Sequence, residues 1–525
     1  MMTTSQLSLA ATCACCISLS GYAQMIDKTK APNAADEGIN KSLTEEIGAG
    51  RGDIFTPNSS VYIISRDPFR AVRRGRQLFQ RKFRRQDGDG PYVRDGKGDI
   101  GNNIGIGAGS TDSCAACHAC PRGSAGSGGD VVTRPDSRDA PHLFGLGIKE
   151  MLADEITAGL RSRRDQAVAD ARRQRIAVTA ALDSKGISYG SVTAMPDGSL
   201  DLTKVEGVDP DLRVRPFFAH GGTISIREFI IGALNNEMGF QALDPEVTAA
   251  SNKGRTITPS GMVLDGKLDV VEIPPDPDPT NVASGDPVRN QMATAVVDYL
   301  EFYLLNYFKP GTYEQTDQTA NGRSVFDRAG CSSCHVADLQ IEKDRRVADV
   351  ETVYDPRNGI FNTLFATATT FVKTVEDKSG FPSLKLPALQ PFLAKNIFTD
   401  FKRHDLGPNF YERNYDGTLQ TRMMTTPLWG VGGTAPYGHD GRSINLNEVI
   451  LRHGGEAQQS RELFAAASPR DRGDLVVFLN SLVLFPPDDT ASNLDPGDRN
   501  EGNFPQFRHG ALKLTLLFND PSDIE

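Results

Sequence analysis

The chain has 525 residues, of which 38% are hydrophobic and 24% are charged. This composition is typical of a globular protein long enough for more than one domain, and it excludes a disordered or collagen-like chain. The formal net charge of −10 disfavours a broad nucleic-acid-binding surface. After the first few dozen positions no run approaches the roughly 18 apolar residues of a membrane-spanning helix, so we do not expect a spanning segment in the mature protein.

The first element is an apolar segment over residues 1–23. It ends in Gly21-Tyr22-Ala23, a small-x-small pattern typical of a secretory cleavage site, although no Lys or Arg precedes the apolar stretch. A wrongly chosen start codon is the alternative. We predict a signal peptide and a periplasmic or otherwise exported protein, followed by a polar arm over residues 24–60. The cysteines that remain after cleavage are Cys114, Cys117, Cys120, Cys331 and Cys334.

Two short stretches carry most of these cysteines: CAACH at 114–118 and CSSCH at 331–335. A Cys-x-x-Cys pair alone can be a redox dithiol, half of a zinc site or a haem attachment site. The histidine that follows favours haem, because two thiols on one turn reach the two vinyl groups while the next imidazole reaches the iron. We therefore predict two covalently bound haem c groups. The alternative is a single zinc site built from both pairs. Cys120 has no partner left and is expected to be a small buried residue.

The predicted attachment residues are Cys114 and Cys117 with His118 as iron ligand, and Cys331 and Cys334 with His335 as iron ligand. Each pair follows a Gly-Arg dipeptide and an apolar pair, within residues 73–83 and 321–330 respectively, which predicts a helix before each site.

Between the two sites the pattern predicts an Arg-rich helix over 155–182, a hairpin around Pro196-Asp197-Gly198 and a helix over 223–240. Ser225 and Glu228 form a capping box for that last helix. Glu237 lies in its final turn, where the helix dipole opposes a negative charge. A linker is predicted over 274–287 and an aromatic core helix over 298–308. After the second site, Ser468 and Pro469 predict the start of a closing helix over 468–485.

These elements predict a mainly α protein with two cytochrome c-like haem domains, extended loops and a small β insertion. The expected domains are an N-terminal haem domain over 61–320, with insertions, and a C-terminal haem domain over 321–490. A tail follows over 491–525.

The stretch TTPLWGVGGTAPYGHDGRSINLNEVILRHGGEA, residues 425–457, carries a family resemblance. Its TAPYGHDG is similar to a segment of bacterial di-haem cytochrome c peroxidases. TPLWG, HDGR and HGGEA, together with FGLG at 144–147, resemble the related di-haem oxidoreductases described as putative peroxidases. MauG and the rubber oxygenases are more distant relatives. The resemblance runs from about residue 60 to about residue 490 and is most specific in the haem stretches and in 425–457.

The resemblance implies an activity. Electrons from a small donor protein, a cytochrome c or a cupredoxin, would enter at the C-terminal haem and pass to the N-terminal haem, where hydrogen peroxide or another small oxidant is reduced. Two alternatives stay open. The chain could be an electron-transfer cytochrome without catalysis, or it could oxidise an organic or protein substrate.

The resemblance also implies site residues. His453 stands where the peroxidases have a methionine ligand, so the C-terminal iron would have two histidines. His142 is a candidate displaceable ligand of the N-terminal iron, and Glu237, followed by Met238, matches the acid that transfers protons during peroxide cleavage. Thr434 and Pro436 match carbonyl ligands of a calcium ion between the haems. His439 is expected to support the site rather than to bind iron. Trp429 is expected mainly to pack, with electron transfer between the haems as the alternative.

Overall fold

The computed structural model describes a large part of the chain. The described residues are 42–84, 87, 111–119, 125–128, 130–131, 138–240, 243–272, 292–307, 311–312, 315–346, 348–349, 369–370, 372–375, 384–387, 391–413 and 417–483. The predicted signal peptide, the tail over 491–525, Cys120 and the linker over 274–287 lie wholly or almost wholly outside these residues.

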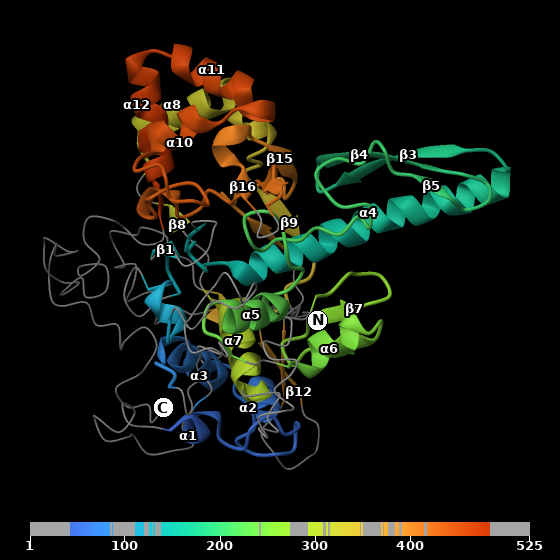
Figure 1. Cartoon of the computed structure of the whole chain (residues 1–525), viewed down its shortest axis with the longest axis vertical. Coiled ribbons are helices and arrows are strands. Elements are labelled where there is room, and N and C mark those ends of the chain that lie inside the picture. Colours follow the sequence, from blue (N-terminus) through green and yellow to red (C-terminus); the bar gives the residue numbers. More distant parts are fainter. Residues whose placement is uncertain are drawn as a thin grey trace, which may run out of the picture.

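A helical body surrounds the first haem stretch (Figure 1). Helix α7 (Thr294–Asn306) of this body is almost completely buried. It carries the predicted aromatic stripe, which confirms that this stripe is core. Half of the predicted capping box before Glu237 is confirmed, since Ser225 Oγ accepts from the Glu228 N–H at 3.0 Å. The Glu228 carboxylate accepts from the Ile224 N–H rather than from the Ser225 N–H. The helices of this body are α1 (Leu43–Ile47), α2 (Ser60–Arg66), α3 (Pro68–Gln80), α5 (Ile226–Asn236), α6 (Pro245–Ser251) and α7 (Thr294–Asn306).

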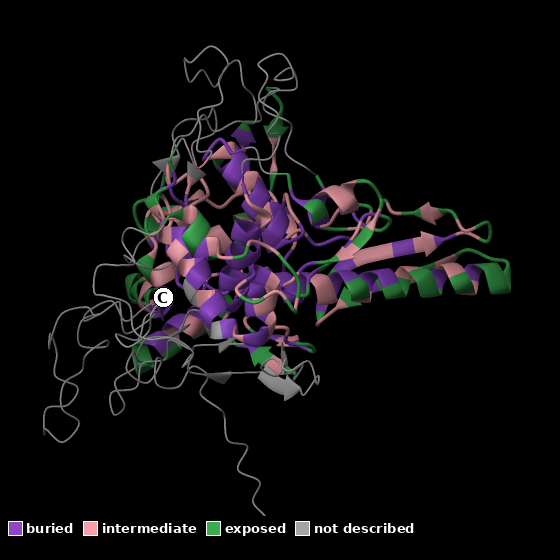
Figure 2. Cartoon of the chain, turned by 90° about the horizontal axis from the view of Figure 1, so that it is seen from below, coloured by how far each residue is buried: buried purple, intermediate pink, exposed green. Residues whose placement is uncertain are grey.

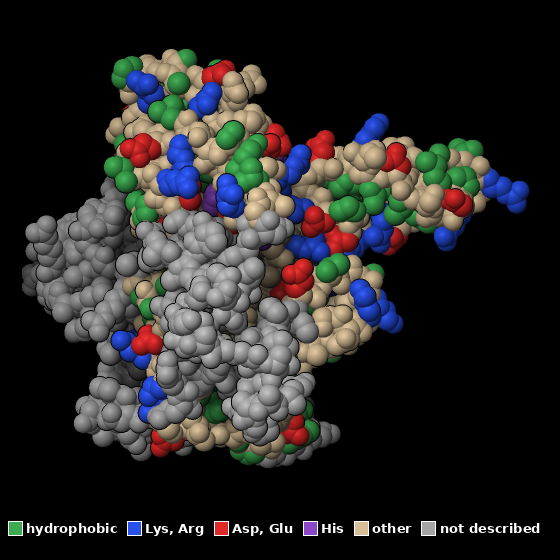
Figure 3. Space-filling model, in the orientation of Figure 1, with side chains coloured by type: hydrophobic (Ala, Val, Ile, Leu, Met, Phe, Trp, Pro, Cys, Tyr) green, Lys and Arg blue, Asp and Glu red, His purple; other side chains and the backbone are tan. Residues whose placement is uncertain are grey.

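A long helix and a small antiparallel sheet project from the body as an arm (Figure 1). The helix is α4 (Leu146–Gln174), and the sheet has the order β3 (Val178–Ser184), β4 (Ile187–Ala194), β5 (Leu200–Asp201). The arm is buried where it leaves the body and more exposed toward its end (Figure 2), where Lys and Arg side chains gather (Figure 3). The predicted hairpin at 196–198 is confirmed by β4 and β5. The predicted Arg-rich helix is eight residues too long at its C-terminus, because residues 178–182 pair with β4.

A second group of helices lies on both sides of the second haem stretch in the sequence. Helix α8 (Asp317–Arg328) packs across α12 (Pro469–Asn480), and α10 (Leu446–Arg452) and α11 (Gln458–Ala466) lie beside them (Figure 1). The predicted start of the closing helix is confirmed, since Ser468 Oγ accepts from the Asp471 N–H at 3.0 Å and Pro469 occupies the first helical position.

Short strands lie between and beside these helices, and they overturn the predicted fold class. They form two- and three-stranded antiparallel sheets, so the described structure is mixed α and β, and it gives no clear pair of cytochrome c folds. Most of these strands have two to four residues, too few to show the alternation by which a strand is recognised. The remaining pairs are β1 (Asp130–Val131) with β2 (Arg138–Asp139), β6 (Arg255–Ile257) with β7 (Val263–Asp265), β8 (Gly311–Thr312) with β19 (Leu482–Val483), β9 (Leu339–Ile341) with β14 (Phe392–Ala394), β10 (Ala348–Asp349) with β11 (Thr369–Thr370), β12 (Val372–Val375) with β13 (Leu384–Pro387), β15 (Arg403–Asp405) with β18 (Arg422–Met424), and β16 (Glu412–Arg413) with β17 (Leu419–Gln420).

One hydrophobic cluster joins the two halves of the sequence. It contains Leu152 and Ile156 of α4 together with Leu339, Phe401 and Trp429 from beyond residue 320. The segments that contain Leu339, Phe401 and Trp429 are therefore held against the start of the arm by buried apolar contacts. Of the described helices, none combines the length and the apolar character that crossing a membrane requires.

Candidate haem-binding sites

The two Cys-x-x-Cys-His stretches fold in the same way. Each begins with one turn of 3₁₀ helix, η3 (Cys114–Ala116) and η5 (Cys331–Ser333). In each, the histidine N–H donates to the first cysteine carbonyl at 3.0 Å, and the second cysteine N–H donates to the same carbonyl at 3.3 Å. This is the one-turn geometry that places two thiols and the next imidazole on one side of the chain.

Both histidines of these stretches direct one ring nitrogen at a backbone carbonyl. His118 Nδ1 lies 2.8 Å from the Pro141 oxygen, and His335 Nδ1 lies 3.0 Å from the Phe398 oxygen. A carbonyl only accepts, so each Nδ1 carries the proton and each Nε2 keeps a lone pair for a metal. Burial lowers the pKa of both imidazoles, to about 4 for His335. Neutral imidazoles oriented in this way fit the ligand that haem iron requires.

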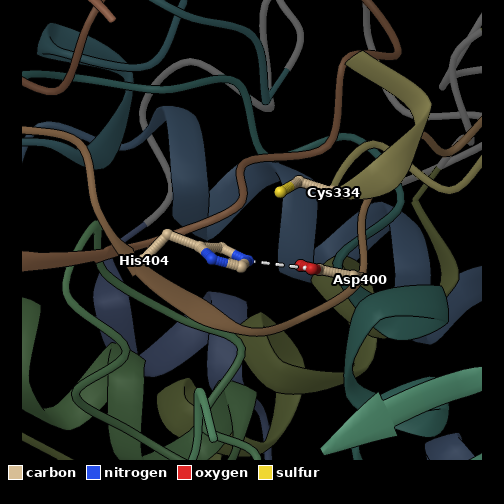
Figure 4. Close-up of side chains that lie close together, drawn as sticks. All are labelled: Cys334, Asp400 and His404. Carbon is tan, nitrogen blue, oxygen red and sulfur yellow. Dashed lines mark hydrogen bonds and ion pairs between the residues drawn. The ribbon is translucent and has the colours of Figure 1, made fainter. Parts of the chain in front are cut away.

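The geometry does not support a zinc site made from both cysteine pairs. All four described cysteines are free thiols. Among the described residues, one group of three potential metal ligands lies within 4.8 Å, and it combines Cys334 with Asp400 and His404 rather than with the first pair (Figure 4). Cys334 is also a predicted thioether position, and a thioether sulfur would be a poor zinc ligand.

His404 lies between two carboxylates. Its Nε2 is 2.9 Å from Asp400 Oδ2, and its Nδ1 is 2.7 Å from Glu456 Oε2. Burial lowers the pKa of His404, but the hydrogen bonds to Asp400 and Cys334 outweigh it and raise the pKa to about 11. The sequence alone assigned no role to His404. The one sequence feature that pointed to this site was Glu456, the partner of His404, which belongs to the HGGEA stretch.

His453, predicted as the second ligand of the C-terminal iron, lies close to His335. It directly follows α10, which Asn445 caps, and its Nδ1 is 2.7 Å from the Val449 carbonyl oxygen. The two imidazoles are near enough that a charge on His453 would lower the pKa of His335. Burial lowers the pKa of both histidines. In both rings Nδ1 faces a backbone carbonyl, which leaves Nε2 free to accept a metal bond. The assignment of His453 as the second ligand of the C-terminal iron stays a prediction.

Glu237 lies beside the first haem stretch. It ends α5, where its N–H donates to the Ala233 carbonyl at 2.9 Å. Burial raises the pKa of the Cys117 thiol, and the Glu237 carboxylate raises it further by its negative charge. The sequence predicted Glu237 in the last turn of a helix over 223–240, whereas α5 ends at Asn236 and Glu237 is the residue that caps it. Its charge is near enough to affect the pKa of Cys117, a predicted haem attachment residue.

His142 lies next to the carbonyl that holds His118. Its Nε2 is 3.0 Å from the Trp429 carbonyl oxygen. Burial, with a smaller contribution from the nearby Lys149, lowers the pKa of His142 to about 3. Nδ1 of His142 is buried and has no hydrogen-bond partner among the described residues. The Trp429 indole packs tightly on Gly145, where a Cβ atom would come within 2.7 Å of the ring.

The remaining predicted residues lie near the His453 helix. The His439 carbonyl accepts from the Asp139 N–H at 2.9 Å, which ties the 425–457 stretch to the region after the first haem stretch. Thr434 follows η7 (Val431–Gly433), and Pro436 follows a cis peptide bond. The calcium ion assigned to Thr434 and Pro436 stays a prediction.

Comparison with known proteins identifies one part of the chain. No curated protein matches the chain. The model of the family described as "Di-haem oxidoreductase, putative peroxidase" matches residues 337–482, which include His404, the 425–457 stretch and the closing helix α12. The matched part begins two residues after His335. The resemblance predicted from the sequence is confirmed over residues 337–482, which match the model of the di-haem oxidoreductase family.

Proposed function

We propose that the chain is an exported di-haem c-type oxidoreductase that reduces hydrogen peroxide or another small oxidant. Electrons enter at the C-terminal haem and pass to the N-terminal haem. The observation that carries the proposal is the identical fold of the two Cys-x-x-Cys-His stretches, each with its histidine Nδ1 on a backbone carbonyl. Two equivalent attachment sites in one chain suit transfer of electrons from one site to the other.

The C-terminal site suits electron transfer. Cys331 and Cys334 would hold the haem, and His335 and His453 would bind its iron. An iron with two strong protein ligands passes electrons and does not bind an oxidant. The donor is a small redox protein, and the net charge of −10 favours a donor with a basic surface.

The N-terminal site suits catalysis. Cys114, Cys117 and His118 would hold a haem there, which when bound supplies the redox chemistry for peroxide cleavage. Cleavage of H₂O₂ to two waters consumes two electrons and two protons. We assign to Glu237 the transfer of a proton from the near oxygen to the leaving oxygen, which is supported by the effect of its charge on the pKa of the Cys117 thiol.

Three measurements on protein secreted by a host competent for cytochrome maturation test the proposal. Mass spectrometry should show two added haems, and reduced cytochrome c should be oxidised when peroxide is added. Electron paramagnetic resonance should show a high-spin ferric signal, either at rest or after half-reduction. A colourless protein contradicts the proposal. Two permanently low-spin irons without donor oxidation would instead identify an electron carrier, and turnover of an organic substrate alone would identify the third function.

A further inference from the structure

We propose that His142 links the two haem sites electronically, as the middle of a continuous chain of covalent and hydrogen bonds between His118 and His335. The proposal rests on the proposed function, because it assumes a haem at each site. It assigns His142 a position behind the His118 ring and makes it part of the route between the sites.

The route begins at the N-terminal site. His118 Nδ1–H donates to the Pro141 carbonyl at 2.8 Å. Pro141 is covalently bonded to His142, whose Nε2–H donates to the Trp429 carbonyl at 3.0 Å. In His118, Nδ1 is the ring nitrogen that faces away from a metal bound to Nε2. The residue after Pro141 therefore lies behind the His118 ring, away from the face on which an oxidant would bind.

The route continues along the 425–457 stretch to the C-terminal site. Trp429 follows Leu428, whose N–H donates to the Ile397 carbonyl at 3.0 Å. The next residue, Phe398, accepts from His335 Nδ1 at 3.0 Å. Four hydrogen bonds of 2.8 to 3.0 Å thus connect the covalently bonded segments that lie between the two imidazoles. These are ordinary strong hydrogen-bond lengths, and no step crosses open space.

Burial keeps the carbonyl groups of Ile397, Phe398 and Trp429 in place, whereas Pro141 is exposed. Ile397 and Phe398 are 0% exposed and Trp429 is 2% exposed. Water therefore does not compete for these carbonyl groups, and hydrogen bonds in such surroundings are stronger than in water. Trp429 contributes its backbone carbonyl to the route. Its indole Nε1 has no hydrogen-bond partner in the described part of the chain and packs on Gly145.

The step itself is simple. One electron leaves the site of His335, which is oxidised, and reaches the site of His118, which is reduced. No covalent bond forms or breaks, and no proton has to move along the route. Between the two predicted iron ligands His118 and His335, His142 is the member that bridges two segments with its side chain, so it is the position at which a substitution interrupts the route.

Direct measurement of electron transfer between the haems of the holoprotein tests the inference. A ruthenium photoreductant delivers one electron, and absorbance follows its redistribution between the two haems. His142→Phe keeps a ring but removes the N–H donor, and His142→Leu is a second variant without it. Both should slow the transfer by about 10-fold or more. His142→Gln, which restores an N–H at the Nε2 position, should recover most of the rate. Trp429→Phe keeps the carbonyl and should stay within a few-fold of the unsubstituted protein.

Controls separate the two proposals. Haem content by mass and both reduction potentials should stay unchanged in every variant. If the unsubstituted protein carries no haem or transfers no electron between haems, the proposed function fails. If it does both and His142→Phe and His142→Leu transfer electrons at the same rate, only the role of His142 is wrong. A Trp429→Phe rate as slow as that of His142→Phe would also overturn the route, because the indole would then carry the electron.

Discussion

Gly322 of α8 lies directly against the carbonyl oxygen of Asp474 in α12, so that a Cβ atom on Gly322 would collide with it. Gly75 of α3 lies in the same way against the carbonyl oxygen of Tyr299 in α7. Each glycine precedes an arginine and belongs to the helix before a Cys-x-x-Cys-His stretch. The two attachment sites are therefore supported by the same device, a helix crossing that only glycine permits at its closest point.

The first prediction concerns this crossing. Gly322→Ala forces α8 and α12 apart and should lower the free energy of unfolding by about 1–3 kcal/mol. Urea denaturation measures the change. Gly473→Ala in α12 is the matched control, since nothing lies within 4 Å of its Cβ position. It should leave stability unchanged or raise it by up to about 1 kcal/mol. Equal effects of the two substitutions would show that the close approach is unimportant.

The second prediction concerns the acid. Glu237→Gln keeps the size of the side chain but cannot release and recover a proton, so peroxide turnover should fall by ~100-fold or more. Steady-state oxidation of reduced cytochrome c measures it. Glu462→Gln, on the exposed face of α11, removes the same charge away from the site and should have no effect. If turnover of the Glu237 variant stays within a few-fold, Glu237 is not the acid.

The third prediction concerns the C-terminal iron. His453→Met replaces an imidazole by a thioether, which favours ferric iron less, so the reduction potential of one haem should rise. Spectroelectrochemical titration resolves the two haems, and the potential of the N-terminal haem serves as the internal control. Covalent attachment should be unaffected, because Cys331 and Cys334 are unchanged. Unchanged potentials on both haems would exclude His453 as a ligand.

Local sequence patterns predicted the elements that position the sites. The caps at Ser225 and Ser468, the one-turn cysteine stretches and the burial of the 298–308 helix follow from short-range rules of hydrogen bonding and periodicity. The contacts of His404 with Asp400 and Glu456 could not be predicted, because Glu456 is 52 residues away from His404 and no spacing encodes the pairing. The same holds for His142 and Trp429, which are 287 residues apart. The short strands were not predicted, for a different reason. Strand pairs of two to four residues are determined by tertiary packing rather than by the β propensity of their own residues.

The last prediction concerns pH and the helix that presents Glu237. The Glu228 carboxyl is 4% exposed and accepts from the Ile224 N–H at 2.8 Å and the Glu272 N–H at 3.1 Å. Burial outweighs these hydrogen bonds and raises the pKa of Glu228 from 4.5 to about 7. The folded state therefore holds the proton more tightly than the unfolded state. The resulting stabilisation is complete below about pH 4.5 and is lost as the pH rises through about 7.

Glu228→Gln removes this titration and keeps an oxygen that can accept one of the two N–H groups. Relative to the variant, the unsubstituted protein should lose up to roughly 3 kcal/mol of unfolding free energy between pH 5 and pH 8, at 1.36 kcal/mol for each pKa unit. Urea midpoints at several pH values measure the difference, and Glu462→Gln shows how much of it comes from loss of an exposed charge. A difference between the two proteins that stays constant across this range would mean that Glu228 is already ionised in the folded state at pH 5.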